Sequence, residues 1–120
     1  MEDALSSLDV WRRSRKLAVD IYKEFGHCRD WGFKDQITRS AISVPSNIAE
    51  GYERNSKKDF CNFLRIARGS CAELRTQLYI GQDIGYIKAS SGKQLQNEAL
   101  QISKMIQGLI NRYKKGQAQY

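Results

Sequence analysis

The sequence has few of the residues on which metal and cofactor chemistry depends. It contains one histidine, one proline and three cysteines among 120 residues. A di-metal centre in a helical bundle needs inward-facing Glu-x-x-His pairs, which His27 alone cannot supply. Cys28, Cys61 and Cys71 are odd in number and include no Cys-x-x-Cys pair, so we expect free thiols in a reducing compartment. We therefore expect neither a metal nor a cofactor.

Enzyme signatures and membrane segments are also missing from the sequence. It has no Gly-x-Ser-x-Gly motif and no glycine-rich phosphate loop, so we expect a protein that is not an enzyme. No run reaches the roughly 18 apolar residues of a membrane-spanning helix. The opening Met1-Glu2-Asp3-Ala4 lacks the basic start of a secretory signal, so we expect a cytoplasmic location.

Four segments show the apolar spacing of amphipathic helices, and none shows strand alternation. The expected helices cover about residues 10–25 and 33–52, then a third that opens at Ser56 and frays near Gly81 and Gly85, and a fourth over about 90–113. Short loops between them predict an all-α, antiparallel up-down-up-down four-helix bundle. Asp9 is the expected first N-cap, and Pro45 is expected to kink the second helix. Residues 1–120 would form one domain, with its core at about 8–115 and a flexible tail at 116–120.

Positive charge is concentrated in the second half of the chain. The formal net charge is +7, and residues 61–120 hold nine Lys/Arg against three Asp/Glu, whereas residues 1–60 hold eleven against ten. No acid follows Glu98. A basic, acid-free segment is typical of a protein with a polyanionic partner, but a solvated charged tail would have the same composition. Both interpretations remain open at this point.

The expected topology gathers basic residues at one end of the bundle. In up-down-up-down order, the start of the first helix, the second turn and the end of the fourth helix share that end. The residues expected there are Arg12, Arg13, Arg15, Lys16, Arg54, Lys57, Lys58, Arg112, Lys114 and Lys115. Two stripes at helical spacing extend this cluster, Arg12-Lys16-Lys23 and Arg65-Arg68-Arg75.

These basic residues predict phosphate contact rather than reading of a base sequence. The chain has no helix-turn-helix spacing, RNP-type aromatic motif or zinc finger. Charged outer faces occur on any soluble bundle, and this alternative stays open for each stripe. We expect the clustered residues to bind nucleic acid through its phosphates.

Two polar residues fall beside the apolar seams of the expected helices. Asn47 lies between Val44 and Ile48, and Glu73 lies beside Leu74. Burial of either group without a partner would be costly, so we expect Ser70 to bond to Asn47 and Arg39 or Arg75 to pair with Glu73. A network that fixes helix register explains these residues better than a ligand site does.

Aromatic residues exceed what the core of a narrow four-helix bundle needs. We expect some of them to line a subunit interface. The residues concerned are Tyr22, Phe33, Tyr52, Tyr79 and Tyr86.

Two motifs resemble those of a known family. The segment Ser43-Val44-Pro45-Ser46-Asn47-Ile48-Ala49-Glu50-Gly51, followed by Arg54, is similar to the central signature of the 23S rRNA intervening-sequence proteins. The segment Phe63-Leu64-Arg65-Ile66-Ala67-Arg68-Gly69-Ser70, followed by Glu73-Leu74, is similar to their second signature. The opening Leu8-Asp9-Val10-Trp11 fits as well, whereas Cys28-Arg29-Asp30-Trp31 departs from the apolar turn of the family.

The resemblance implies a four-helix bundle that assembles into a homopentameric ring and has no catalytic residues. Its signature positions would serve helix packing and register: Asn47, Glu50, Gly51, Gly69, Ser70 and Glu73. We expect a non-enzymatic oligomer that binds RNA or a ribonucleoprotein. The alternative is a protein-interaction adaptor, such as the reverse-transcriptase accessory subunit that a related branch supplies to diversity-generating retroelements.

Overall fold

The computed structural model describes residues 4–5 and 8–117, with side chains up to residue 114. Over this range the chain forms four helices and no strand, which confirms the all-α prediction. The helices are α1 (Asp9–Glu24), α2 (Trp31–Glu53), α3 (Lys57–Asp83) and α4 (Ala89–Gln117).

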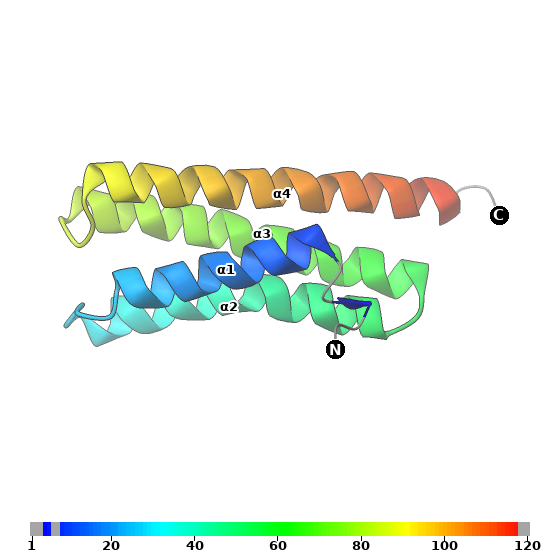
Figure 1. Cartoon of the computed structure of the whole chain (residues 1–120), viewed down its shortest axis with the longest axis horizontal. Helices are drawn as coiled ribbons and strands as arrows, with labels where there is room; N and C mark the ends of the chain where they lie inside the picture. Colours follow the sequence, from blue (N-terminus) through cyan, green and yellow to red (C-terminus); the bar gives the residue numbers. More distant parts are fainter. Residues whose placement is uncertain (1–3, 6–7, 118–120) are drawn as a thin grey trace.

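The four helices run along the long axis of the molecule, and each reverses the direction of the one before it (Figure 1). Each packs against its successor, and α4 packs back against α1. The architecture is therefore the predicted up-down-up-down bundle. With 16 residues α1 is much shorter than the 29-residue α4, and its first turn is set back from the end of the bundle that carries the α2–α3 turn (Figure 1).

Side-chain caps begin α2 and α3. The carboxylate of Asp30 accepts a hydrogen bond from the Phe33 amide at 3.1 Å, and the hydroxyl of Ser56 accepts one from the Asp59 amide at 3.2 Å. The prediction of Asp9 as the first N-cap is wrong. Leu8 holds that position without a side-chain bond, and Asp9, as the first helical residue, pairs with Arg12 one turn later.

Proline and glycine residues interrupt the helices less than the sequence predicts. α2 continues through Pro45 as one helix, and a bend at this proline stays a prediction. α3 does not fray at Gly81, because this buried glycine lies against the Phe33 ring inside the packed bundle. The chain turns at Gly85, whose φ of +83° is accessible to glycine at little cost. α4 extends to Gln117, past the start of the predicted tail, of which 118–120 lie outside the described residues.

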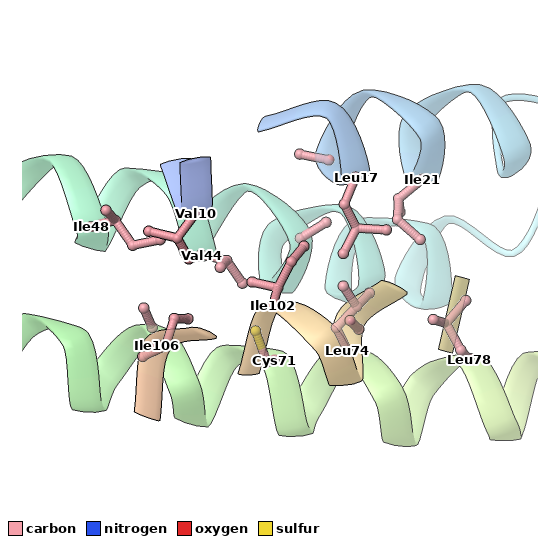
Figure 2. Packing of buried hydrophobic residues seen from close by; sticks show 14 of the residues in the cluster. Val10, Leu17, Ile21, Val44, Ile48, Cys71, Leu74, Leu78, Ile102 and Ile106 are labelled. Atoms are coloured by element: carbon pink, nitrogen blue, oxygen red, sulfur yellow. The ribbon is translucent and has the colours of Figure 1, made fainter. Parts of the chain in front are cut away.

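The core is mainly aliphatic and contains residues from all four helices (Figure 2). Ile21 of α1, Ile48 of α2, Leu74 of α3 and both Ile102 and Ile106 of α4 have no exposed surface. Each such side chain contributes about 1.5–3 kcal/mol relative to an exposed one. Burial of these residues from all four helices makes the bundle a single cooperative unit.

A small hydrogen-bonded network crosses the seam between α2 and α3. The hydroxyls of Ser43 and Ser70 lie 2.9 Å apart. The side-chain amide of Asn47 donates to the Ser43 hydroxyl and also to the backbone carbonyl of Ser43. Ser70 therefore reaches Asn47 through Ser43 and not directly as expected.

Glu73 is exposed and makes no ion pair with any described residue, because it lies on the outer side of α3.

The opposite end of the bundle is closed by a contact between the two loops. The Tyr86 hydroxyl donates to the Asp30 carboxylate at 2.8 Å, while the Tyr86 ring meets Phe33 edge-on with centroids 5.2 Å apart. Hydrogen bonds from the Phe33 amide and from Tyr86 hold the pKa of Asp30 below its ordinary value. This contact places Tyr86 far from the α2–α3 turn.

Two glycines of the expected signature have opposite structural roles, which predicts opposite effects of alanine. A Cβ at Gly51 would lie 2.6 Å from the Phe63 Cβ and 3.3 Å from the Phe60 Cα, so Gly51→Ala should force the helices apart and cost about 1–3 kcal/mol. A Cβ at Gly69 would meet nothing within 4 Å, so Gly69→Ala should stabilise α3 by about 0.5–1 kcal/mol.

Urea denaturation followed by circular dichroism measures both variants against the wild-type chain. Equal destabilisation by the two substitutions would contradict the close approach of α2 and α3 at Gly51.

Candidate nucleic-acid interface

Five of the eleven basic residues in the first half of the chain pair with nearby carboxylates. Among the described residues, five ion pairs form, and each uses a cation from α1, α2 or the residue that follows α2. They are Arg12–Asp9, Arg13–Glu98 at 2.6 Å, Lys16–Asp20 at 3.0 Å, Arg39–Asp35 at 2.9 Å and Arg54–Glu50 at 3.9 Å. Exposed pairs of this kind contribute little stability, but they cancel charge locally.

The structure moves part of the expected basic cluster away from the end of the bundle. Arg13 binds Glu98 in the first half of α4, and the pair lies more than three turns from Lys114 along that helix. Lys16 likewise lines a pocket with Glu98. Arg12 stays nearer the end, because its partner Asp9 shares a pocket with Arg112. The cause of the displacement is the position of α1 along the bundle axis, since its first turn is set back from this end (Figure 1).

The end itself keeps the remaining members of the cluster. Arg54 lies over the Phe63 ring, with its guanidinium carbon 5.0 Å from the centroid. Lys57 and Lys58 are exposed in the first turn of α3, and Arg112 and Lys114 are exposed in the last turns of α4. The Lys115 side chain lies outside the described part of the chain.

The predicted arginine stripe of α3 lies beside α4 and forms no ion pair with a carboxylate of the described residues. Arg68 is half-buried and donates to the Gln107 side chain of α4, and Arg65 donates to the Asn62 amide oxygen at 3.2 Å. Arg75 follows two turns later, half-buried. Neutral amides orient these guanidinium groups but leave their charge uncompensated.

Two lysines that the sequence did not single out extend this stripe onto α4. Lys93 and Lys104 precede Gln107 by fourteen and three residues, spacings that place them on the flank of α4 beside α3. Both are exposed, and neither forms an ion pair within the described range. We define the basic face as the outer α3–α4 surface, with these members: Lys57, Arg65, Arg68, Arg75, Lys93, Lys104 and Lys114.

Acidic residues are nearly absent from this surface. Glu98, the single acid of α4, points to α1, where it binds Arg13. Glu73 lies three residues after Ser70, which faces α2, so its carboxylate is on the other flank of α3. Asp59 lies eleven residues before Ser70, a spacing that puts it on the same α2-facing side. Among the described acids of α3 and α4, this leaves Asp83, the last residue of α3. The basic face is thus a continuous positive strip along the bundle.

An apolar groove lies on a different flank, between α1 and α2. Ala18, Val19, Tyr22, Ile42 and Pro45 line it, and Arg15 and Lys23 form its rim. Val19, Tyr22 and Ile42 expose 44%, 47% and 47% of their surface, which is unusual for such residues on a soluble bundle.

A second exposed apolar strip runs along the α2 side of α3. Ile66, Ile80 and Ile84 expose about half of their surface each, and Glu73 lies between the first two. We call this strip the α3 ridge.

Of the aromatic residues expected at an interface, Tyr22, Tyr79 and Tyr86 are exposed, but Phe33 and Tyr52 pack against the core.

The metal-ligating side chains of the described residues are dispersed over the bundle. No group of three or more His, Cys, Asp or Glu side chains among them could hold a metal ion. Burial raises the pKa of the Cys71 thiol to about 12, against a smaller opposing effect of Arg75. In the same part of the chain, no helix is long and apolar enough to cross a membrane.

These observations define the class as a four-helix bundle with one basic and one apolar flank. The chain belongs to the 23S rRNA-intervening sequence protein family, which it matches over residues 6–108. A similar solved structure is a protein of unknown function from the S23 ribosomal protein family of Bacteroides thetaiotaomicron. It is 28% identical, with a TM-score of 0.79, and the match covers 84% of this chain and 97% of that one. Among curated proteins, none matches the chain.

The burial of the thiols predicts their reactivity. Cys61 and Cys71 are 1% and 0% exposed, whereas Cys28 is half-buried in the first loop. In the native protein at pH 8, a disulfide reagent such as DTNB should therefore modify one thiol rapidly, and the other two only in denaturant. Rapid native-state labelling of two or three thiols, counted by mass spectrometry, would contradict the packing of α3 against α4 at these positions.

Proposed function

We propose that this protein is a non-enzymatic, oligomeric bundle that binds RNA, alone or in a ribonucleoprotein, through the basic face. The observation that carries the proposal is the partition of charge. Four of the seven cations of α1 and α2 pair with carboxylates, whereas none of the described side chains of the basic face does, and two of them have amide partners instead. Uncompensated guanidinium and ammonium groups along one strip fit a phosphate backbone, from which binding releases counterions.

Two further observations support this proposal. The family is described by its link to 23S rRNA intervening sequences, which is compatible with an RNA ligand. The three cysteines of the chain are free, as expected for the reducing cytoplasm that we propose as its location.

A charge-matched pair of double variants tests the RNA proposal. Arg75→Gln/Lys104→Gln removes two charges from the basic face, and Arg29→Gln/Arg39→Gln removes two exposed charges elsewhere. The first variant should weaken binding of a single-stranded RNA and lower the salt slope of log affinity by about 1.4, because about 0.7 counterion is released per contact. Fluorescence anisotropy at several salt concentrations gives both quantities.

The control double variant should keep at least most of the salt slope. If both variants lose affinity equally, net charge rather than the basic face governs binding. If the wild-type protein binds no RNA at low salt, the RNA proposal fails, and a protein adaptor such as a reverse-transcriptase subunit replaces it.

We propose that the oligomer forms when the α3 ridge of one copy enters the α1–α2 groove of the next. Both surfaces are apolar, and the rims have opposite charge: Arg15 and Lys23 at the groove, Glu73 on the ridge. Because the two surfaces differ, the contact is heterologous and generates a ring if it closes. Five subunits is the number that the family resemblance implies.

A charge swap tests this interface. Glu73→Lys should place two like charges opposite each other and dissociate the oligomer, whereas Asp83→Lys makes the same change on α3 away from the ridge and should leave it intact. Lys23→Glu combined with Glu73→Lys should restore assembly. Light scattering distinguishes the 13.8 kDa monomer from any assembly. A wild-type monomer at micromolar concentration would contradict the oligomer, and an assembly indifferent to Glu73→Lys would contradict this interface.

A further inference from the structure

A pocket opens at the end of the bundle where α2, α3 and α4 meet. Its walls include Tyr52 from the last turn of α2, Phe60 from the first turns of α3 and Tyr113 from the last turns of α4. The Phe60 ring meets both tyrosines edge-on, with centroids 5.9 Å from Tyr52 and 5.1 Å from Tyr113. Phe60 is 5% exposed, and both tyrosines are half-buried. Aromatic side chains from three helices thus line one open pocket.

The polar groups of the pocket are available to a ligand. Within the described residues, neither the Tyr52 nor the Tyr113 hydroxyl has a hydrogen-bond partner. Gly51 also lines the pocket and cannot be enlarged, since a Cβ there would collide with Phe63. The absence of a side chain at this position lets α2 approach α3 closely beside the Phe60 ring.

The charges around the pocket distinguish its ligand from a phosphate. Lys57 lines the pocket and is the first member of the basic face on α3, and Lys114, the last on α4, follows Tyr113 directly. Glu53 lines the pocket as well and offsets the charge of Lys57, so the lining has no net positive charge to hold an anion. The arrangement suits a neutral, planar group in the pocket, with negative charge beyond it on Lys114 and the rest of the basic face. A nucleotide has this distribution of charge.

We propose that this pocket binds a nucleobase of a single-stranded RNA whose phosphates lie along the basic face. The inference rests on the proposed function and makes it more specific: base stacking on tyrosine needs an unpaired strand, so a duplex cannot satisfy it. Stacking tolerates every base, while the Glu53 carboxylate accepts hydrogen bonds from exocyclic amino groups, as cytosine carries. Binding of one base in this pocket determines where the strand begins along the basic face, whose positive charge is otherwise uniform.

Binding of a cytidine 12-mer and of an abasic 12-mer with the same phosphates tests the inference by fluorescence anisotropy. The wild-type protein should bind the cytidine strand about tenfold more tightly, with equal salt slopes for the two strands. Tyr113→Leu should abolish this difference, and Tyr113→Phe should keep most of it. Tyr86→Leu removes an exposed tyrosine at the opposite end and should leave the difference unchanged.

Photocross-linking uses the wild-type protein, so its result does not depend on whether a variant folds. A 5-bromocytidine strand should cross-link to the peptides that contain Tyr52 or Tyr113. Equal affinity for the cytidine and abasic strands, or cross-links confined to other peptides, would overturn the pocket while the RNA proposal stands. Failure of both strands to bind at low salt would overturn the RNA proposal and the pocket together.

Discussion

The close approach of α2 and α3 at Gly51 determines how one end of this bundle is built. With no side chain at this position, the backbone of α2 lies against Phe60 and Phe63 of α3. The contact holds Tyr52 beside Phe60, and it places Arg54 over the Phe63 ring. A few residues away, the Ser43–Ser70 hydrogen bond keeps the same two helices in register. Small residues on this seam therefore position the aromatic and basic groups that a ligand would meet.

Charge is partitioned between the two halves of the bundle for a simple compositional reason. Ten of the thirteen acids lie in the first sixty residues, so α1 and α2 can neutralise their own cations at helical spacing. α3 and α4 have too few acids to pair with all of their cations, and Arg65 and Arg68 donate hydrogen bonds to amide side chains instead. An isolated guanidinium in water is not costly, so this arrangement folds well while its field remains available to a polyanion.

The sequence predicted the helices well, but it predicted their relative positions along the bundle axis less well. The periodic seams around Leu64 and Leu74 fix the faces of α3, because burial of one stripe leaves no other choice. The length of α1 was predicted well, at about 10–25 against Asp9–Glu24, but only the packing shows how far this helix is set back from the end of the bundle (Figure 1). Lys93 and Lys104 are isolated in sequence, and nothing local assigns them to a site. They join Arg68 only through the register of α3 against α4, which the Arg68–Gln107 contact records.

The positions of the apolar surfaces relative to the basic face decide whether assembly and RNA binding can coexist. The groove lies on the α1–α2 flank and the ridge on the α2 side of α3, so the two proposed contact surfaces are neighbouring flanks that share α2. A heterologous contact between neighbouring flanks turns the direction of assembly at each step, whereas opposite flanks would extend it in a line. Such a ring would place α2 towards its axis and α4 on the outside. The basic face would then remain exposed on every subunit, and one flexible strand could bridge neighbouring copies, which raises affinity without any new type of contact.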